Sequence, residues 1–132
     1  MIPSEVRNGL KANLEAIKGI RVYEIIPTPA VAPAAVIGQL DFTFDLNNAR
    51  GLDQANQDVI VLVQRLSERT GQNELDKYLA GSGDYSIKQA IESDRTLGGA
   101  CNTLRVTSAE AGSYASGDIE FLSYRYRITI WG

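Results

Sequence analysis

The sequence predicts an α+β fold, in which a mainly antiparallel β-sheet carries helices packed on one face. Three observations lead to this class. Apolar residues recur at helical spacing near the N-terminus, later segments alternate or run apolar at strand length, and polar or glycine-rich turns separate them. With 132 residues, the chain has the usual size of one domain, which we place at 1–132. The predicted order of elements is α-β-β-β-α-α-β-β.

The first predicted element is a helix that begins at Pro3 and ends near Gly19. Proline is common at the first helical position, and Glu5 lies in the first turn, where acidic residues are favoured. Four apolar residues then follow at spacings of four and three, so they share one face of the helix. They are Val6, Leu10, Leu14 and Ile17. We expect residues 20–26 to continue as a short strand.

A proline-rich segment follows this strand. Pro27, Pro29 and Pro33 each lack a backbone donor and bias the preceding residue toward extended geometry. The segment is too short and too apolar for a domain linker. We therefore expect a stiff arm or loop that packs against protein.

Two strands joined by a long loop are predicted next. Residues 36–46 alternate between apolar and polar side chains, as a strand with one buried face does. Residues 59–66 form a nearly continuous apolar run, which is typical of a central strand covered on both faces. The polar residues 47–57 between them are long for a hairpin loop, and long loops more often carry function.

Two short helices are predicted before the C-terminal strands. The first spans residues 71–80 and ends at a Gly-Ser-Gly sequence. Its inward-facing residues are expected to be Leu75, Tyr78 and Leu79. The second helix opens at Ser86, whose spacing to Gln89 is that of a capping box.

Two strands, over residues 102–109 and 119–131, close the chain. In the last strand, the even-numbered residues from 122 to 130 form the core face by pattern. The opposite face mixes aromatic and guanidinium side chains, which are enriched at the centres of protein interfaces. Its members include Phe121, Arg125, Arg127 and Trp131. This pattern fits either a protein contact surface or a solvated sheet face.

The composition disfavours several classes of function. The chain has no histidine, which removes Ser-His-Asp and Cys-His nucleophilic systems and histidine-ligated zinc. A net charge of −3 disfavours binding to nucleic-acid phosphates. No apolar run approaches the roughly 20 residues of a membrane helix, and no signal peptide is recognised. We therefore expect a soluble protein, made in a cytoplasm, that needs no cofactor or metal.

Carboxylates offer the main catalytic or metal-binding alternative. Asp41 and Asp45 share one face of a predicted strand, and Asp58 follows the loop. Such a group could hold a divalent cation or act as an acid–base pair, although the loop lacks the spacing of a calcium-binding loop. Solvated charges are the favoured interpretation. Cys101 has no neighbouring base or second thiol in the sequence, so we expect a small buried side chain there.

Several segments taken together resemble a known family. They read VLV at 61–63, LDKYLAGSG at 75–83, SIK at 86–88, AIE at 90–92, DRTLGGA at 94–100 and LRVT at 104–107. Over about residues 40–131, the chain resembles the tail terminator, or tail completion, proteins of siphophages that infect actinobacteria. The matching positions mark helix ends and turns rather than chemistry.

The resemblance implies a structural virion protein and no enzyme. It implies a hexameric ring at the head-proximal end of the tail tube, which stops tube polymerisation and joins the tail to the neck and head. The implied partners are further copies of the chain, the tail tube protein and a neck or stopper protein. DNA would pass through the lumen without specific binding, and assembly would take place in the host cytoplasm.

A ring of this kind needs two complementary patches on each subunit. The predicted patches are the second face of the last strand (Phe121, Arg125, Arg127, Trp131) and the proline segment (Pro27, Pro29, Pro33). The loop residues Asn47, Asn48, Arg50, Asp53 and Gln57 are candidates for axial contact with tube or neck, and Asp41 and Asp45 for the lumen. The alternatives are a head-closure (stopper) or other neck or minor tail protein and, outside that class, a small ligand-binding or enzyme domain using Asp41, Asp45 and Asp58.

Overall fold

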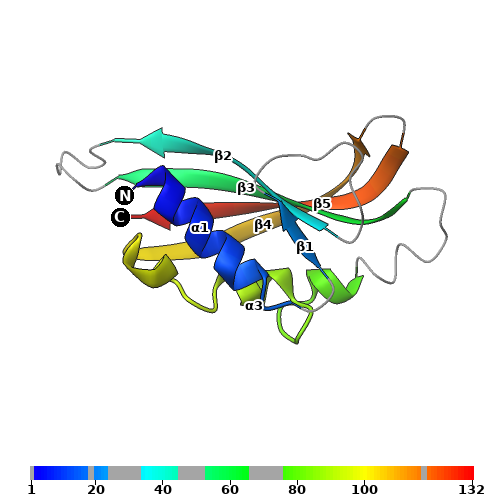
Figure 1. The fold of residues 1–132 in the computed structure, drawn as a ribbon, viewed down its shortest axis with the longest axis horizontal. Coiled ribbons are helices and arrows are strands. Elements are labelled where there is room, and N and C mark those ends of the chain that lie inside the picture. The colour runs from blue at the N-terminus through cyan, green and yellow to red at the C-terminus, as the bar shows by residue number, and fades with distance from the viewer. Residues whose placement is uncertain (1, 18–19, 24–33, 45–52, 66–75, 117–118) are drawn as a thin grey trace.

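The computed structural model describes residues 2–17, 20–23, 34–44, 53–65, 76–116 and 119–132. In chain order its elements are helix α1 (Pro3–Leu14), strands β1 (Arg21–Tyr23), β2 (Ala34–Thr43) and β3 (Gln54–Arg65), helix α3 (Ile87–Ile91), the 3-10 helix η2 (Leu97–Gly99), and strands β4 (Thr103–Ser116) and β5 (Ile119–Trp131) (Figure 1). Residues 76–79 are also helical.

The described strands form one mixed sheet in the spatial order β1-β2-β3-β5-β4. β1 is parallel to β2, and the three other pairs of neighbours are antiparallel. The predicted α+β class, with sheet as the larger part, is therefore confirmed. β3 lies in the middle of the sheet, which agrees with its apolar run. β5 lies between β3 and β4, so it is hydrogen-bonded to a strand on each side.

One face of the sheet carries the main core. Helix α1 crosses this face beside α3 (Figure 1). The residues predicted for the inner face of the N-terminal segment, Val6, Leu10, Leu14 and Ile17, are all buried in this core. They share it with inward side chains of the two central strands, among them Val59, Val61, Tyr126, Ile128 and Ile130. Burying each such side chain contributes about 1.5–3 kcal/mol to the free energy of folding, so this layer is the main hydrophobic contribution to stability.

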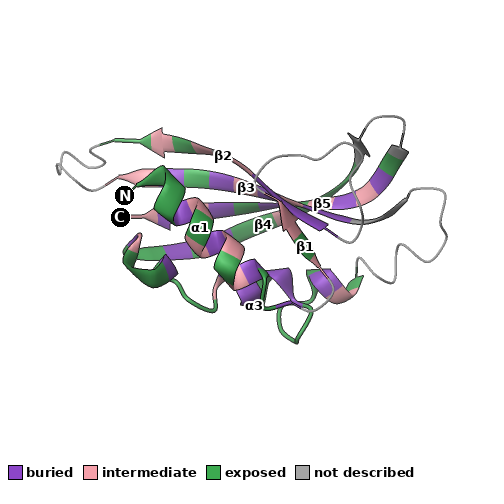
Figure 2. Ribbon diagram, viewed as in Figure 1, coloured by how far each residue is buried: buried purple, intermediate pink, exposed green. Residues whose placement is uncertain are grey.

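The alternation predicted for β5 is present. Tyr126, Ile128 and Ile130 are buried on the helix-covered face, whereas Arg125 and Arg127 are exposed on the other face (Figure 2). The hydroxyl of Tyr126 donates to the backbone carbonyl of Tyr78 at 3.1 Å, which fixes the helical turn at residues 76–79 to the centre of the sheet. Burial, with a smaller effect of Tyr124, raises the pKa of Tyr126, so this hydroxyl remains a donor.

β2 shows how an irregular strand keeps its apolar side chains inward. Its register with β3 shifts between Ile37 and Leu40. Before the shift, Ala35 and Ile37 face the core; after it, Leu40 and Phe42 do. Gly38 sits within the irregularity, where a Cβ would lie 3.2 Å from the carbonyl oxygen of Asp58. The shift therefore reverses the facing of alternate residues without exposing the apolar set.

Several boundaries differ from the prediction. Helix α1 ends at Leu14 rather than near Gly19, and β2 ends at Thr43 rather than at residue 46. Phe44, predicted for the buried face, is 69% exposed and stacks on Phe42 with ring centroids 5.5 Å apart. β3 begins at Gln54, well before the predicted residue 59, because hydrogen bonding to β2 and β5 continues through its polar half.

The helix predicted over residues 71–80 is described only from residue 76. Tyr78 faces the core as predicted, but Leu79 is 38% exposed. Leu75 lies outside the described residues. One helical turn has room for few inward positions, so the second apolar residue of this turn faces outward.

Candidate functional site

The sheet face opposite the helices carries the arginines of β5. In the register with its neighbours, Asp58 of β3 stands opposite Arg127, and Glu110 of β4 stands opposite Arg125. The closest charged contacts run diagonally instead. Arg125 Nε lies 3.9 Å from Asp58 Oδ2, and Arg127 Nε lies 3.5 Å from Glu110 Oε1. The prediction that Arg125 and Arg127 share a face is therefore confirmed.

These ion pairs contribute little to stability. All four side chains are about half exposed, and exposed pairs of this kind are worth about 0–1 kcal/mol. The charges are therefore available to meet a partner, because exchanging one exposed ionic contact for another costs the fold little.

Phe121 does not belong to the exposed part of this face. It is 2% exposed and packs with Val36 and Leu62 in a second cluster, against which Ile60 is partly buried. Its place among the predicted subunit contacts needs correction, since its side chain already has partners within the chain. Alternation placed it on the correct face, but a strand pattern does not show which end of a face is covered.

The predicted axial contacts fall into two groups. Asn47, Asn48 and Arg50 lie outside the described residues, as do Asp45 and the three prolines. Asp53 is described, and its backbone exchanges hydrogen bonds with Gly132 at 3.0 and 3.1 Å.

Gln57 is not a loop residue. It lies within β3, its side chain is 0% exposed, and its Nε2 donates to the carbonyl oxygen of Asp58 at 2.9 Å. The prediction of an axial contact by Gln57 is therefore wrong. The strand begins earlier than its polar composition indicated, and this position faces the core side of the sheet.

Of the three carboxylates considered as a pocket, the structure describes Asp41 and Asp58. Asp41 is exposed on β2, opposite Asn56, whereas Asp58 is next to Arg125. Asp45 lies outside the described residues. Among the described residues, no group of three or more Asp, Glu, Cys or His side chains is placed to hold a metal ion.

A groove that the sequence did not predict lies between α3 and the start of β4. Its volume is about 480 Å³, and its lining comprises Lys88, Glu92, Arg95, Thr103, Leu104, Arg105, Val106 and Trp131. Three of these side chains are cationic and one is acidic. Trp131, predicted as a subunit contact, is half-buried and lines this groove.

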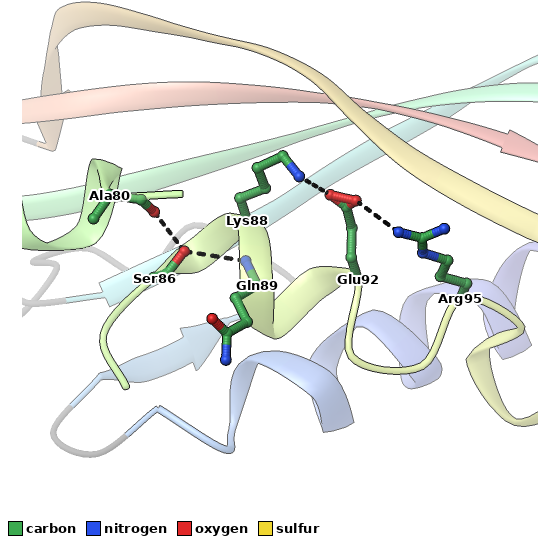
Figure 3. A network of polar contacts seen from close by, with 6 residues as sticks. All are labelled: Ala80, Ser86, Lys88, Gln89, Glu92 and Arg95. Atoms are coloured by element: carbon green, nitrogen blue, oxygen red, sulfur yellow. Dashed lines mark hydrogen bonds and ion pairs between the residues drawn. The ribbon is translucent and has the colours of Figure 1, made fainter. Parts of the chain in front are cut away.

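The acidic side chain of the groove holds two of its cations. The Lys88 ammonium forms an ion pair with one carboxylate oxygen of Glu92, and Arg95 Nη2 lies 3.9 Å from the other oxygen (Figure 3). The Glu92 side chain is only 9% exposed, whereas Lys88 and Arg95 extend into solvent. The spacing of four residues from Lys88 to Glu92, and of three from Glu92 to Arg95, was the available signal for this cluster.

Helix α3 begins at a capped serine. Ser86 Oγ accepts from the backbone nitrogen of Gln89 at 3.1 Å and donates to the carbonyl oxygen of Ala80 at 2.5 Å (Figure 3). The Gln89 side chain accepts from the backbone nitrogen of Gly83 at 2.8 Å rather than from that of Ser86. The cap predicted at Ser86 is confirmed, and its return bond reaches the Gly-Ser-Gly turn.

The segment after α3 is held by one carboxylate. Asp94 Oδ1 accepts from the Thr96 backbone at 3.1 Å and from its hydroxyl at 2.8 Å, and Oδ2 accepts from the Gly98 nitrogen at 2.9 Å. These bonds, with the Thr96 hydroxyl first, lower the pKa of Asp94 below its usual value. They support the positive φ of +51° at Leu97 and of +69° at Gly98.

Helix α1 packs against the turn that contains Asp94 and Leu97. Asn13 Nδ2 donates to the carbonyl oxygens of Ile91 at 3.0 Å and Asp94 at 3.2 Å. A Cβ on Gly9 would lie 2.6 Å from the Cβ of Leu97, so only glycine allows this approach. The turn is therefore held both by the Asp94 side chain within it and by the residues of α1.

No protein family and no curated protein matches this chain.

Cys101 is buried, as predicted. Its Sγ lies 3.3 Å from the carbonyl oxygen of Arg95, to which the thiol donates. Burial, followed by the negative charge of Asp94, raises the pKa of the thiol, so the thiolate is disfavoured.

None of the helices in the described part of the chain is long and apolar enough to cross a bilayer.

Proposed function

We propose that this chain is a structural virion subunit of a siphophage tail. It acts as a tail terminator that forms a hexameric ring at the head-proximal end of the tube. The ring stops tube polymerisation and connects the tail to the neck. The proposal rests on the segments between residues 61 and 107 that resemble this family.

The geometry of those segments is the observation that supports the proposal best. Within the described residues, Ser86 caps a helix, Asp94 organises a turn, and Gly98 adopts a positive φ. The positions that we matched to the family are thus ones that this backbone uses to end helices and to form turns, and this is what supports the proposal.

A ring also requires different surfaces on the two sides of a subunit. The chain offers the charged sheet face around Arg125 and Arg127 and the groove beside α3; both include residues of β4 and β5, and the groove adds Lys88, Glu92 and Arg95. A net charge of −3 keeps DNA from adhering as it passes through a lumen. Asp41, exposed at the end of β2, is a lumen candidate.

Deleting the gene and imaging the lysate by electron microscopy tests the proposal. We expect filled heads apart from abnormally long, uncapped tails, and normal virions when the gene is supplied from a plasmid. Emptied heads with tails of normal length would instead assign a stopper function. Intact virions would reject a structural function and favour a ligand-binding or enzymatic one.

A further inference from the structure

Two strand edges at one end of the sheet have no strand beside them within the described residues. Among the described strands, β4 is the last of the sheet and pairs with β5 alone. Among these strands, β1 covers β2 only along Ala34, Ala35 and Val36, so residue 37 and residues 40–43 of β2 pair on one side alone, with β3. Edges of this kind present free backbone donors and acceptors that can template pairing with another chain.

The two edges lie at the same level of the sheet. One row of paired residues runs Thr43, Gln54, Trp131, Thr103, and a second runs Asp41, Asn56, Thr129, Arg105. Both rows therefore begin at the open edge of β2 and end at the open edge of β4. Figure 1 shows the end of β2 and the start of β4 at the same end of the sheet, on its opposite sides.

The strand directions also allow the sheet to continue from one copy to the next. β2, β3, β5 and β4 alternate in direction, because each neighbouring pair is antiparallel. A second copy related by rotation about an axis along the strands would place its β2 antiparallel to the first copy's β4. The alternation would then continue across the contact.

The side chains on the two edges are complementary on both faces. Asp41 and Arg105 are both exposed, and neither forms an ion pair with another described residue. Pairing row to row places one opposite the other on the outer face. On the inner face, the half-buried Leu40 and Phe42 would lie beside Val106 and Leu104, which are largely buried in the main core and line the base of the groove beside α3.

We propose that copies of this chain join head to tail by strand addition. The end of β2, residues 40–43, pairs antiparallel with the start of β4, residues 103–106, of the next copy. Asp41 then faces Arg105, and Leu40 and Phe42 enter the groove. The contact joins two different edges, so it is heterologous and repeats around a ring. The inference rests on the proposed ring and names the surface that builds it.

A disulfide between the two edges tests this contact in the purified full chain. In a Cys101→Ala background, Thr43→Cys and Thr103→Cys are combined and the protein is oxidised. Within one chain two strands separate these positions, placing the Cα atoms about 14 Å apart. A disulfide requires less than about 7 Å, so it can form only between copies. We expect a ladder of multimers on non-reducing gels.

Asn56→Cys with Thr103→Cys is the matched control, because Asn56 is exposed but lies on the central strand β3. It should remain monomeric. A control ladder equal to that of the edge pair would show random collision and overturn the proposal, as would monomer alone from the edge pair.

Charge reversal tests the register. In the two-cysteine protein, Asp41→Arg or Arg105→Asp alone should lower the yield of the ladder several-fold, and the two together should restore it. Single reversals that leave the yield unchanged would overturn the pairing of Asp41 with Arg105. Both residues are exposed, so the variants are expected to fold.

The outcome is separable from that of the gene deletion. Long tails on deletion with no ladder would reject strand addition while keeping the terminator function. A ladder with intact virions on deletion would keep the contact and reject the function.

Discussion

Asp94 shows how one exposed side chain can define a turn. Its two oxygens accept hydrogen bonds from Thr96 and Gly98, and the turn they hold carries Leu97 in a left-handed conformation. A non-glycine residue there costs about 1–2 kcal/mol of backbone strain, which the surrounding contacts must offset. Asp94 and Asn13 supply those contacts from opposite sides.

The hydrogen bonds to Asp94 predict a specific pH dependence. The pKa of Asp94 is lower in the folded chain than its reference value of 3.8, so the stabilisation is present above that value. It is lost as pH falls through the folded-state pKa. Asp94→Asn should therefore unfold at lower urea concentration near neutral pH, with the difference from wild type shrinking as the solution is acidified.

Thr96→Val is the matched variant, because it keeps the carboxylate and removes the hydroxyl that contributes most to the shift. It should lose part of the same pH-dependent stability. Urea midpoints that run parallel for wild type and Asp94→Asn across the acidic range would contradict the role given to this carboxylate.

At the scale of single residues, the sequence predicted those whose surroundings are local. The cap at Ser86 and the faces of Tyr126 and Arg125 follow from spacing alone. Phe121 and Gln57 were misjudged because their burial depends on strands distant in the sequence. Alternation assigns a side chain to a face but does not say what lies over that face.

At the scale of elements, α3 is the clearest case of a helix made possible by its ends. It has five residues, too few to be stable by helix propensity, and it is stabilised by its cap and its buried face. Ser86 connects that cap to the preceding turn through the carbonyl of Ala80. The helix in turn positions Lys88 and Glu92 along the groove (Figure 3).

Ser86→Ala should therefore destabilise the chain by about 1–2 kcal/mol, because the nitrogen of Gln89 loses its acceptor and the cap is lost. The free energy of unfolding from urea titration measures this. Ser82→Ala is the control, since Ser82 is exposed in the neighbouring turn and should change stability little. Equal effects of the two substitutions would show that the cap does not hold α3.

Element boundaries were predicted less well than element types. The polar half of β3 resembled a loop, but neighbouring strands on both sides supply its hydrogen bonds. The register shift in β2 moved the buried set from odd to even positions, and no local signal apart from Gly38 marks it. Such features depend on pairing between segments.

At the scale of the whole molecule, the sheet divides the chain into a covered face and a charged one. The placement of β5 between β3 and β4 brings Asp58, Arg125, Arg127 and Glu110 together. A sequence pattern carries no record of strand order, so neither this cluster nor the groove beside α3 could be predicted as a unit.

Arg125→Glu tests whether the charged face also takes part in assembly. The side chain is half exposed, so the free energy of unfolding should change by no more than about 1 kcal/mol. We expect incorporation of the protein into purified tails to fall, measured by immunoblot against a tube protein. Lys11→Glu, an exposed reversal on α1, is the control and should incorporate normally. Normal incorporation of both would restrict subunit contact to the strand edges.

The contact between Gly9 and Leu97 carries a consequence for evolution. A side chain can be added at position 9 only if the one at position 97 is withdrawn, since their Cβ atoms would otherwise stand 2.6 Å apart. Glycine at position 97 would remove the closest contact and suit the positive φ, although the backbone at 97, whose carbonyl oxygen would lie 3.1 Å from the new Cβ, would also have to shift slightly. Related chains should therefore show inverse covariation in size at these two positions, a signature that can persist after overall sequence identity has been lost.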